Sequence, residues 1–255
     1  MYRTVNLGFE NNLILYLKSV FFSQDSSARV RAALARRLAD IGELAVHFLD
    51  LVALGGAEGA VAGEGGGGGS GGSSDICTYD TEVAALHDIL SQVVTLLLED
   101  QVNAVKQVLV HYGAARLAVF FGRQRANDVL LSHMITFLND KEDSQLRYCF
   151  FDNITGVAAF VGWQCSAILK PLLQQGLADP EEFVVAQAIN AIASLTRQGL
   201  LEKVAMFDML HDTLPFLMHP NLWIRQAAVG LVEAMAGRLD TVDIQAGLRG
   251  VVSFV

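Results

Sequence analysis

Residues 183–195 read FVVAQAINAIASL, and residues 223–235 read WIRQAAVGLVEAM. The two stretches superpose without a gap, position 183 on position 223 and position 195 on position 235. In both, apolar residues return at steps of three and four, which predicts an α-helix with one buried face. A polar turn that contains proline precedes each stretch, DPEE at residues 179–182 and LMHPN at residues 217–221. A helix that returns at a fixed period of this length is typical of stacked helical repeats.

The same unit is marked along the chain by an acidic residue followed about six positions later by a basic one. After Lys106 the basic position recurs nearly evenly, although Val185 replaces the base once and His219 replaces the acid once. We expect each acid to accept free amide hydrogens at a helix start, and each base to reach an acid of the same or a neighbouring repeat. The predicted ladder comprises Asp25, Arg31, Asp100, Lys106, Asp140, Arg147, Asp179 and Arg225. The alternative is a stripe of basic residues that binds a partner.

These patterns predict an all-α fold, a HEAT-repeat α-solenoid of stacked antiparallel helix pairs with one disordered glycine-rich loop. Apolar residues make up 52% of the chain, prolines number only four, and alternation typical of strands is not sustained. We expect partial repeats over residues 1–54, a Gly/Ser-rich disordered insertion over 55–78, and repeats over 79–255 that are truncated at the C-terminus.

The predicted insertion is the one segment outside the repeats. Eleven of the twenty residues from Gly55 to Ser74 are glycine, so the segment buries too little apolar area to offset its ordering entropy. Its glycine spacings also match phosphate-binding loops. However, no strand precedes the tract and no Gly-Lys-Ser/Thr follows it, so a nucleotide loop is not expected.

Composition and motifs exclude several classes of protein. The net charge of −9 argues against nucleic-acid binding, which calls for a basic stripe. The three cysteines show no paired spacing, as in a reducing compartment. No secretory signal opens the chain, and its most membrane-like window, residues 154–169, is too short to span a bilayer, so a soluble intracellular protein is expected. Because catalytic and metal-binding motifs are absent, we predict no enzyme activity, no cofactor and no metal.

Several sequence strings are not required by the packing of helical repeats. Among them are FFGRQRANDVLLSHMITFLND at residues 120–140, GVAAFVGWQ at 156–164 and HPNLWIR at 219–225. Together they closely resemble the HEAT region of the regulatory subunit of class III phosphatidylinositol 3-kinase, a p150-type scaffold with kinase-like, HEAT and WD40 parts. The resemblance is strong from Tyr79 to Arg225 and weaker from Asp25 to Leu54.

The resemblance implies a non-catalytic scaffold segment. Its partners would be the class III phosphatidylinositol 3-kinase catalytic subunit and Beclin-type coiled-coil subunits, with no nucleic acid. The complex would make phosphatidylinositol 3-phosphate in autophagy and endosomal sorting, so the chain would be cytoplasmic and reach membranes only through the complex. The family's kinase-like domain would precede this chain and its propeller would follow. The alternative is a free-standing HEAT adaptor, such as a transport receptor or phosphatase scaffold.

One polar cluster is our candidate for the binding face. The candidate partner-binding residues form a polar cluster at a helix start after Phe121-Gly122, namely Arg123, Gln124, Arg125, Asn127 and Asp128. In the alternative interpretation, Asn127 or Asp128 caps a helix over residues 129–138 while the arginines face water. The same two interpretations, partner contact or packing, apply to Trp223, and we expect it to cover the junction between two helices.

Overall fold

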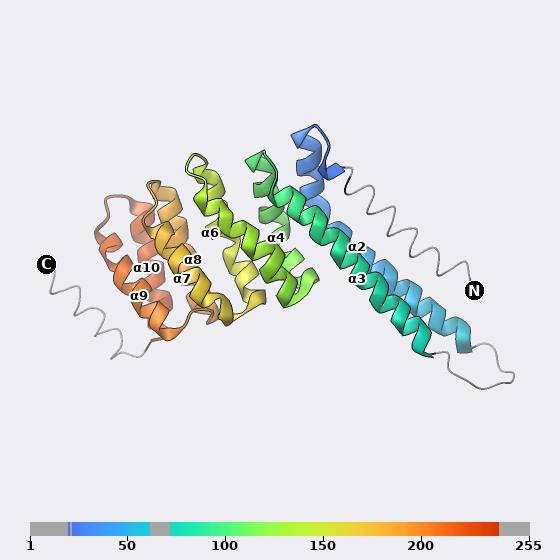
Figure 1. Cartoon of the computed structure of the whole chain (residues 1–255). Helices are drawn as coiled ribbons and strands as arrows, with labels where there is room; N and C mark the ends of the chain where they lie inside the picture. The colour runs from blue at the N-terminus through green and yellow to red at the C-terminus, as the bar shows by residue number, and fades with distance from the viewer. Residues whose placement is uncertain (1–19, 21, 62–71, 240–255) are drawn as a thin grey trace. The chain divides into compact units, whose positions relative to one another are not determined.

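The computed structural model describes residues 20, 22–61 and 72–239. All regular structure in these residues is helical, which confirms the all-α solenoid class. The chain divides into two compact units, Met1–Phe121 and Gly122–Val255, called here the N-terminal and C-terminal units. Figure 1 shows the helices of each unit packed side by side.

Two long antiparallel helices, α2 (Ala28–Val61) and α3 (Gly72–Leu98), form most of the N-terminal unit. Their shared face is apolar and fully buried, with Leu38 of α2 and Leu86, Leu90 and Leu97 of α3 all 0% exposed. The next helix, α4 (Asn103–Arg125), is linked to α2 by Arg116, whose guanidinium contacts Asp40 and Glu43. Burial of this leucine-rich face is the main stabilising contribution here.

The helices extend further into the predicted insertion than we expected. α2 continues to Val61 and α3 begins at Gly72, so helical backbone occupies both ends of the segment 55–78. Extending a helix that is already packed costs less than nucleating one, and this offsets part of the unfavourable glycine propensity. The rest of the predicted disordered loop, residues 62–71, lies outside the described residues.

The C-terminal unit is a two-layer stack of helix pairs. One layer consists of α6 (Ser144–Val161), α8 (Glu182–Gln198) and α10 (Leu222–Ala236), with α8 packed between the other two. The second layer contains α7 (Ser166–Leu177) and α9 (Lys203–Thr213), which pack on each other and on the first layer. Among the short elements of this unit, η1 (Ala126–Leu131), α5 (Ser132–Thr136) and η2 (Phe137–Asn139) lie between α4 and α6. The element η3 (Trp163–Cys165) joins α6 to α7, and η4 (Leu214–Met218) joins α9 to α10.

The apolar window at residues 154–169 is divided between two helices. α6 ends at Val161, Gly162 adopts a positive φ of 96°, and α7 begins at Ser166. Among the described residues, the helix with the length and composition to cross a membrane is instead Tyr79–Leu98 in α3, so our choice of window was wrong. A third of the apolar window in Tyr79–Leu98 is buried inside the structure, and core helices of globular proteins pass the same test.

Candidate functional site

The acids of the predicted ladder lie at turns that precede helices. Each of four carboxylates accepts a hydrogen bond from the backbone N–H two residues further on, which satisfies a donor that the following helix leaves free. The fifth turn has the same geometry, with a histidine ring nitrogen in place of the carboxylate. The acceptor and donor pairs are Asp25–Ser27, Asp100–Val102, Asp140–Glu142, Asp179–Glu181 and His219–Asn221, at 2.8 to 3.1 Å.

Two arginines bridge consecutive repeats through their Nε and NH2 groups. Arg31 donates from these groups to the two oxygens of Asp100, at 2.5 and 3.0 Å. Arg147 contacts Asp179 in the same bidentate way, at 2.7 and 2.9 Å. The NH1 group of each turns back to its own repeat, to the carbonyl of Asp25 or of Asp140. For each arginine, the carboxylate partner therefore belongs to the neighbouring repeat, and the carbonyl partner belongs to the arginine's own repeat.

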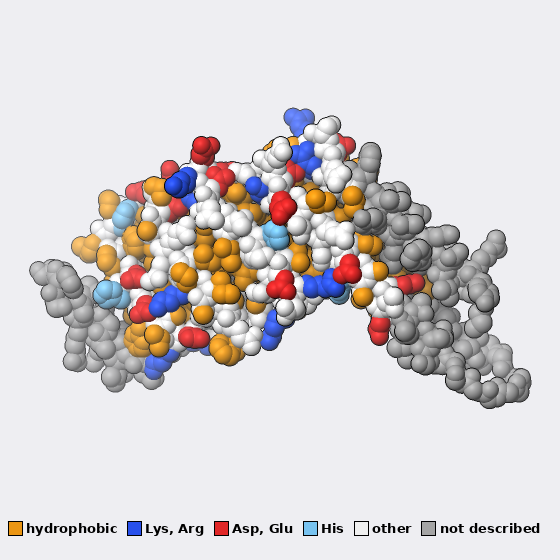
Figure 2. All heavy atoms as spheres, in the orientation of Figure 1, with side chains coloured by type: hydrophobic (Ala, Val, Ile, Leu, Met, Phe, Trp, Pro, Cys, Tyr) orange, Lys and Arg blue, Asp and Glu red, His pale blue; other side chains and the backbone are white. Residues whose placement is uncertain are grey.

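These bridges lie in the interior. The side chains of Arg147 and Asp179 are each 7% exposed, and Asp100 is 4% exposed. Burial opposes ionisation of Asp100, but hydrogen bonds from Arg31 and from the Val102 N–H outweigh it and hold the pKa of this carboxyl below its usual value. Buried, paired arginines do not form an accessible basic stripe, and Figure 2 shows acidic and basic side chains interspersed on the face in view.

Lys106 and Arg225 occupy ladder positions with different contacts. Lys106 donates to the side-chain oxygen of Asn103 at 2.9 Å, and its charge helps to lower the pKa of Asp100. Arg225 donates from NH1 to the carbonyl oxygens of His219 and Pro220, both at 2.7 Å. The carbonyl contact within its own turn therefore matches those of Arg31 and Arg147.

The candidate partner-binding cluster lies where the backbone is interrupted at Gly122. This residue has φ 77° and ψ 166°, a conformation that favours glycine, and helical backbone resumes after it. Residues 126–131 form a π-helix, so Asn127 and Asp128 lie inside a helical segment. The expectation that either residue caps a helix over residues 129–138 was therefore wrong, because the helix begins earlier, directly after the glycine.

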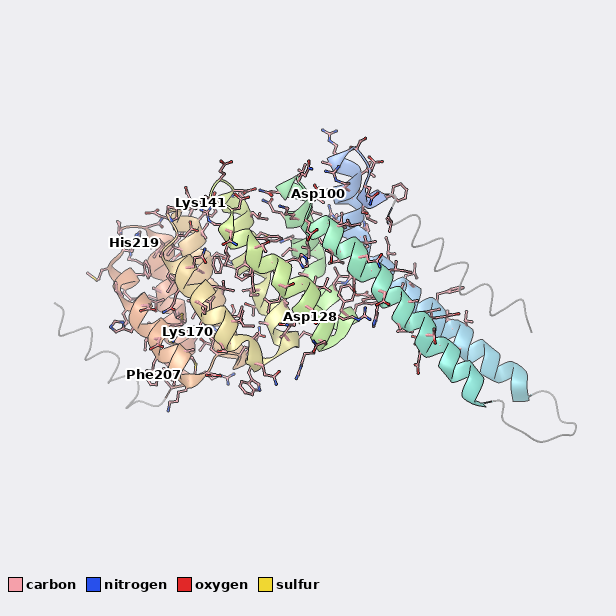
Figure 3. The ribbon with its side chains drawn as sticks, in the orientation of Figure 1. Asp100, Asp128, Lys141, Lys170, Phe207 and His219 are labelled. Carbon is pink, nitrogen blue, oxygen red and sulfur yellow. The ribbon has the colours of Figure 1, made fainter. Side chains whose placement is uncertain are left out.

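Contacts within the cluster centre on Asp128, which Figure 3 labels. Gln124 donates to its Oδ2 at 2.9 Å, one helical turn away, and Asn127 donates to its Oδ1 at 3.0 Å. Arg123, Gln124 and Asp128 are exposed, whereas Arg125 and Asn127 are half-buried. The cluster thus presents an exposed positive charge beside a carboxylate that already has amide partners.

A second segment of unusual sequence lies next to the cluster. A Cβ atom added to Gly162 would lie 3.6 Å from NH2 of Arg123, so the turn after α6 touches this guanidinium. Trp163 follows Gly162 and is 59% exposed. The GVAAFVGWQ and FFGRQR strings therefore meet in space, and we call residues 123–128 with Trp163 the arginine–tryptophan patch. Our sequence reasoning missed Trp163, although a glycine between two apolar helices was a signal for a turn.

No metal or cofactor site is evident in the described part of the chain. Among residues 20, 22–61 and 72–239 there is no group of three or more His, Cys, Asp or Glu side chains that could hold a metal ion. The thiols of Cys149 and Cys165 are buried, and burial raises the pKa of both.

The sequence matches the family described as "PIK3R4-like, middle domain" over residues 9–254. The chain belongs to this family. It is also similar to the probable serine/threonine-protein kinase vps15 of Dictyostelium discoideum, with 38% identity over 168 residues, or 65% of this chain and 8% of the relative. Serine/threonine-protein kinases of the Vps15 type from Schizosaccharomyces pombe and Arabidopsis thaliana are 33% and 32% identical over 62% and 53% of this chain. The resemblance to a class III phosphatidylinositol 3-kinase regulatory subunit is thereby confirmed.

The matched region is a small part of these relatives. It covers 8% of the Dictyostelium protein and 9% of each of the other two. The relatives are named as kinases, whereas the family matched by this chain is a middle domain. What the whole relatives do therefore does not transfer directly to these 255 residues.

Proposed function

We propose that this chain is a non-catalytic scaffold segment of the class III phosphatidylinositol 3-kinase complex. The observation that carries the proposal is the family match, which covers nearly the whole chain. The stacked helix pairs support it, because repeats of this kind expose extended surfaces on which partners assemble. In this role the segment holds the lipid kinase catalytic subunit together with Beclin-type coiled-coil subunits.

The scaffold role assigns no chemical step to these residues. A kinase needs a cradle for phosphates, a base that accepts the substrate proton and carboxylates that hold magnesium. The described residues contain no strand from which a glycine-rich phosphate loop could extend, and no acidic cluster that could hold a metal ion. Any protein kinase activity of a longer form would belong to other parts of that protein.

The complex would act at membranes while this segment stays in the cytoplasm. In α3, Leu86, Leu90, Val94 and Leu97 are fully buried against neighbouring helices, as expected of a core helix. We therefore assign Tyr79–Leu98 to the core of the N-terminal unit. Contact with endosomal and autophagic membranes, where phosphatidylinositol 3-phosphate is made, would come through the other subunits.

The arginine–tryptophan patch is our choice for the surface that binds the catalytic subunit. It combines an exposed guanidinium at Arg123 with the exposed indole of Trp163, and arginine and tryptophan are enriched among residues that dominate binding energy. Gly122 and Gly162, both with positive φ, mark the interruptions of the helical backbone at which the two segments come together.

A capture experiment with the purified catalytic subunit tests both the assembly and the patch. The chain is compared with Arg123→Ala/Arg125→Ala/Asp128→Ala and with Trp163→Ala. We expect each change to weaken capture by about tenfold or more, since truncation of a central interface residue typically costs about 2 kcal/mol. The matched control is Arg29→Ala/Arg37→Ala/Glu142→Ala, which removes the same charges from exposed positions elsewhere.

The outcomes separate the two parts of the proposal. Loss of capture by the patch variants alone, with unchanged helical content, supports both the assembly and the surface. Capture that withstands the patch changes keeps the scaffold role and rejects the patch. Failure of the folded chain to capture the catalytic subunit at physiological salt rejects the scaffold role for this segment.

A further inference from the structure

The turn between η4 and α10 exposes three large apolar side chains within six residues. Met218 is 88% exposed, Leu222 is 53% exposed and Trp223 is 67% exposed. Met218 ends η4, and Leu222 and Trp223 begin α10, so the short connection keeps the three close together. We call residues 218–223 the apolar turn, and Figure 3 labels His219 within it. Single exposed apolar residues are ordinary, but a contiguous group of them typically marks a contact with another molecule.

The two other turns at which helices of the same layer begin carry no such group. Before α8, the residues that correspond to Met218, Leu222 and Trp223 are Ala178, Glu182 and Phe183. Before α6, they are Asn139, Ser144 and Gln145. The one large apolar residue among these six is Phe183, and it is half-buried beside the ring of Tyr148. The stacking of repeats therefore does not require exposed apolar side chains at these positions.

Hydrogen bonds hold the backbone of the apolar turn in place. The N–H of Asn221 donates to Nδ1 of His219 at 3.1 Å, and the N–H of Trp223 donates to the side-chain oxygen of Asn221 at 2.8 Å. The amide of Asn221 also donates to Oε2 of Glu182 at 2.5 Å, and Arg225 donates to the carbonyl of His219 at 2.7 Å. The turn therefore presents its apolar side chains from a well-ordered backbone, which lowers the entropy that binding costs.

The exposed charge beside the apolar turn is negative. Glu182, which contacts Asn221, is exposed, and so is Glu181 next to it. Within residues 20, 22–61 and 72–239, neither glutamate forms an ion pair. The basic side chain at this place, Arg225, is half-buried and directs NH1 to backbone carbonyls of the turn. The surface thus combines an apolar centre with an acidic border.

We propose that the apolar turn is a docking surface for a basic amphipathic helix of a partner protein. The apolar stripe of that helix covers Met218, Leu222 and Trp223, and the lysine or arginine side chains that flank the stripe face Glu181 and Glu182. Methionine adapts to apolar surfaces of different shape, and an indole accepts a cation on its face. The proposal goes beyond the scaffold role and depends neither on the arginine–tryptophan patch nor on the lipid kinase.

Charge favours this occupant over two others that could bury the same side chains. An anionic membrane surface would be repelled by Glu181 and Glu182. A second copy that paired with the same turn through a two-fold axis would bring the glutamates of both copies together. A basic amphipathic helix instead supplies apolar contact at the centre and opposite charge at the border, a common mode of peptide recognition.

Synthetic helical peptides test the proposal with the full 255-residue chain. The first probe is a fluorescein-labelled peptide of about 18 residues, with leucine at steps of three and four and lysine at the flanking positions. A second peptide has glutamate in place of lysine, and a third keeps lysine but has serine in place of leucine. Fluorescence anisotropy measures the dissociation constant of each. We expect the second and third to bind about tenfold or more weakly, because each lacks one of the two contributions.

Variants of the chain then locate the contact. Met218→Ser/Trp223→Ser should weaken binding of the lysine peptide by about tenfold or more, because it removes the apolar centre of the surface. The matched control is Val119→Ser/Val204→Ser, which removes side chains that are 64% and 68% exposed on α4 and α9 and should leave binding unchanged. Glu181→Lys should weaken binding and make it less dependent on salt. Circular dichroism checks that helical content is the same in all variants.

Several results would overturn the proposal. Absence of binding by the lysine peptide, or equal binding by the glutamate peptide, means that a basic helix is not the occupant. An equal loss of binding in the Val119→Ser/Val204→Ser control means that the peptide does not recognise the apolar turn. Adsorption to phosphatidylserine vesicles that Met218→Ser/Trp223→Ser abolishes identifies a membrane as the occupant. Self-association that the same substitutions abolish identifies a second copy.

Discussion

Arg147 and Asp179 form a bidentate ion pair across two consecutive repeats, with Nε 2.7 Å from Oδ2 and NH2 2.9 Å from Oδ1. The same guanidinium reaches the carbonyl of Asp140 through NH1, and the same carboxylate accepts the N–H of Glu181. One arginine therefore fixes the turn of its own repeat and the start of the next helix. Such a pair sets the register of the stack more than its overall stability, because desolvation offsets much of the attraction.

Removing one partner of this pair should be strongly destabilising. Arg147→Met leaves the Asp179 carboxylate buried and without its cation, which typically costs about 3 to 5 kcal/mol. Urea unfolding followed by circular dichroism measures the change. Arg37→Met is the control, because its pair with Asp40 is 71% and 40% exposed and should contribute less than about 1 kcal/mol. Equal losses from the two variants would contradict an interior ladder.

Asp100 should make the stability of the N-terminal unit depend on pH. Its folded-state pKa lies below the usual value, so the carboxylate stabilises the fold above about pH 4 and loses this contribution as pH falls through the folded-state pKa. Asp100→Asn should therefore be less stable than the unchanged chain at pH 7, and the difference should shrink toward pH 3. Urea midpoints at several pH values test this, and a difference that stays constant contradicts it.

The repeat spacing was sufficient to predict the class of fold. It also singled out Arg31, Asp100, Arg147 and Asp179, which pair across repeats, whereas Lys106 and Arg225 make other contacts. It could not decide which repeat supplies the carboxylate for Arg31 or Arg147, because an arginine side chain reaches both its own turn and the next one. The structure shows that it contacts both, through different nitrogens. The spacing of residues along the sequence does not determine which nitrogen of the arginine contacts which repeat.

The predictions for the helix caps and for Trp223 were wrong for physical reasons that are not visible in the sequence. Gly122 resembles an ordinary glycine inside an apolar helix, and only its positive φ shows that the helix restarts there, so Asn127 and Asp128 were misplaced as caps. Trp223 was expected to cover a junction between helices but is 67% exposed. The residue of α8 that corresponds to Trp223 is Phe183, and its ring centroid lies 5.9 Å from that of Tyr148 on α6. The residue of α8 that corresponds to Tyr148 is Ala186, which has no ring. The indole of Trp223 therefore lacks the corresponding aromatic partner.

The thiol of Cys149 should be unreactive in the folded protein. Burial raises its pKa to about 12, so very little thiolate is present at pH 8, and the side chain is only 7% exposed as well. In a Cys77→Ser background, iodoacetamide should modify Cys149 only as fast as the C-terminal unit opens. Mass spectrometry with and without 6 M urea measures the ratio, and rapid alkylation without urea would show that α6 is not packed as described.

Gly176 and Gly230 should respond to alanine in opposite directions. A Cβ atom at Gly176 would lie 2.3 Å from Cζ of the buried Phe151 and 2.8 Å from Cβ of Ala188, so α7 approaches α6 and α8 closely only because no side chain intervenes. Gly176→Ala should therefore destabilise the chain by about 1 to 3 kcal/mol, the usual cost of overpacking a core. Thermal unfolding provides the measurement.

Gly230→Ala is the matched comparison, since both glycines lie in helices. The nearest atom to its added Cβ is NH2 of Arg197 at 3.8 Å, an ordinary contact. Alanine should then stabilise α10 by about 0.5 to 1 kcal/mol, because it loses less conformational entropy than glycine on folding. A gain at both positions would mean that Phe151 moves aside without cost, and a loss at both would mean that the surroundings of Gly230 are tighter than the structure shows.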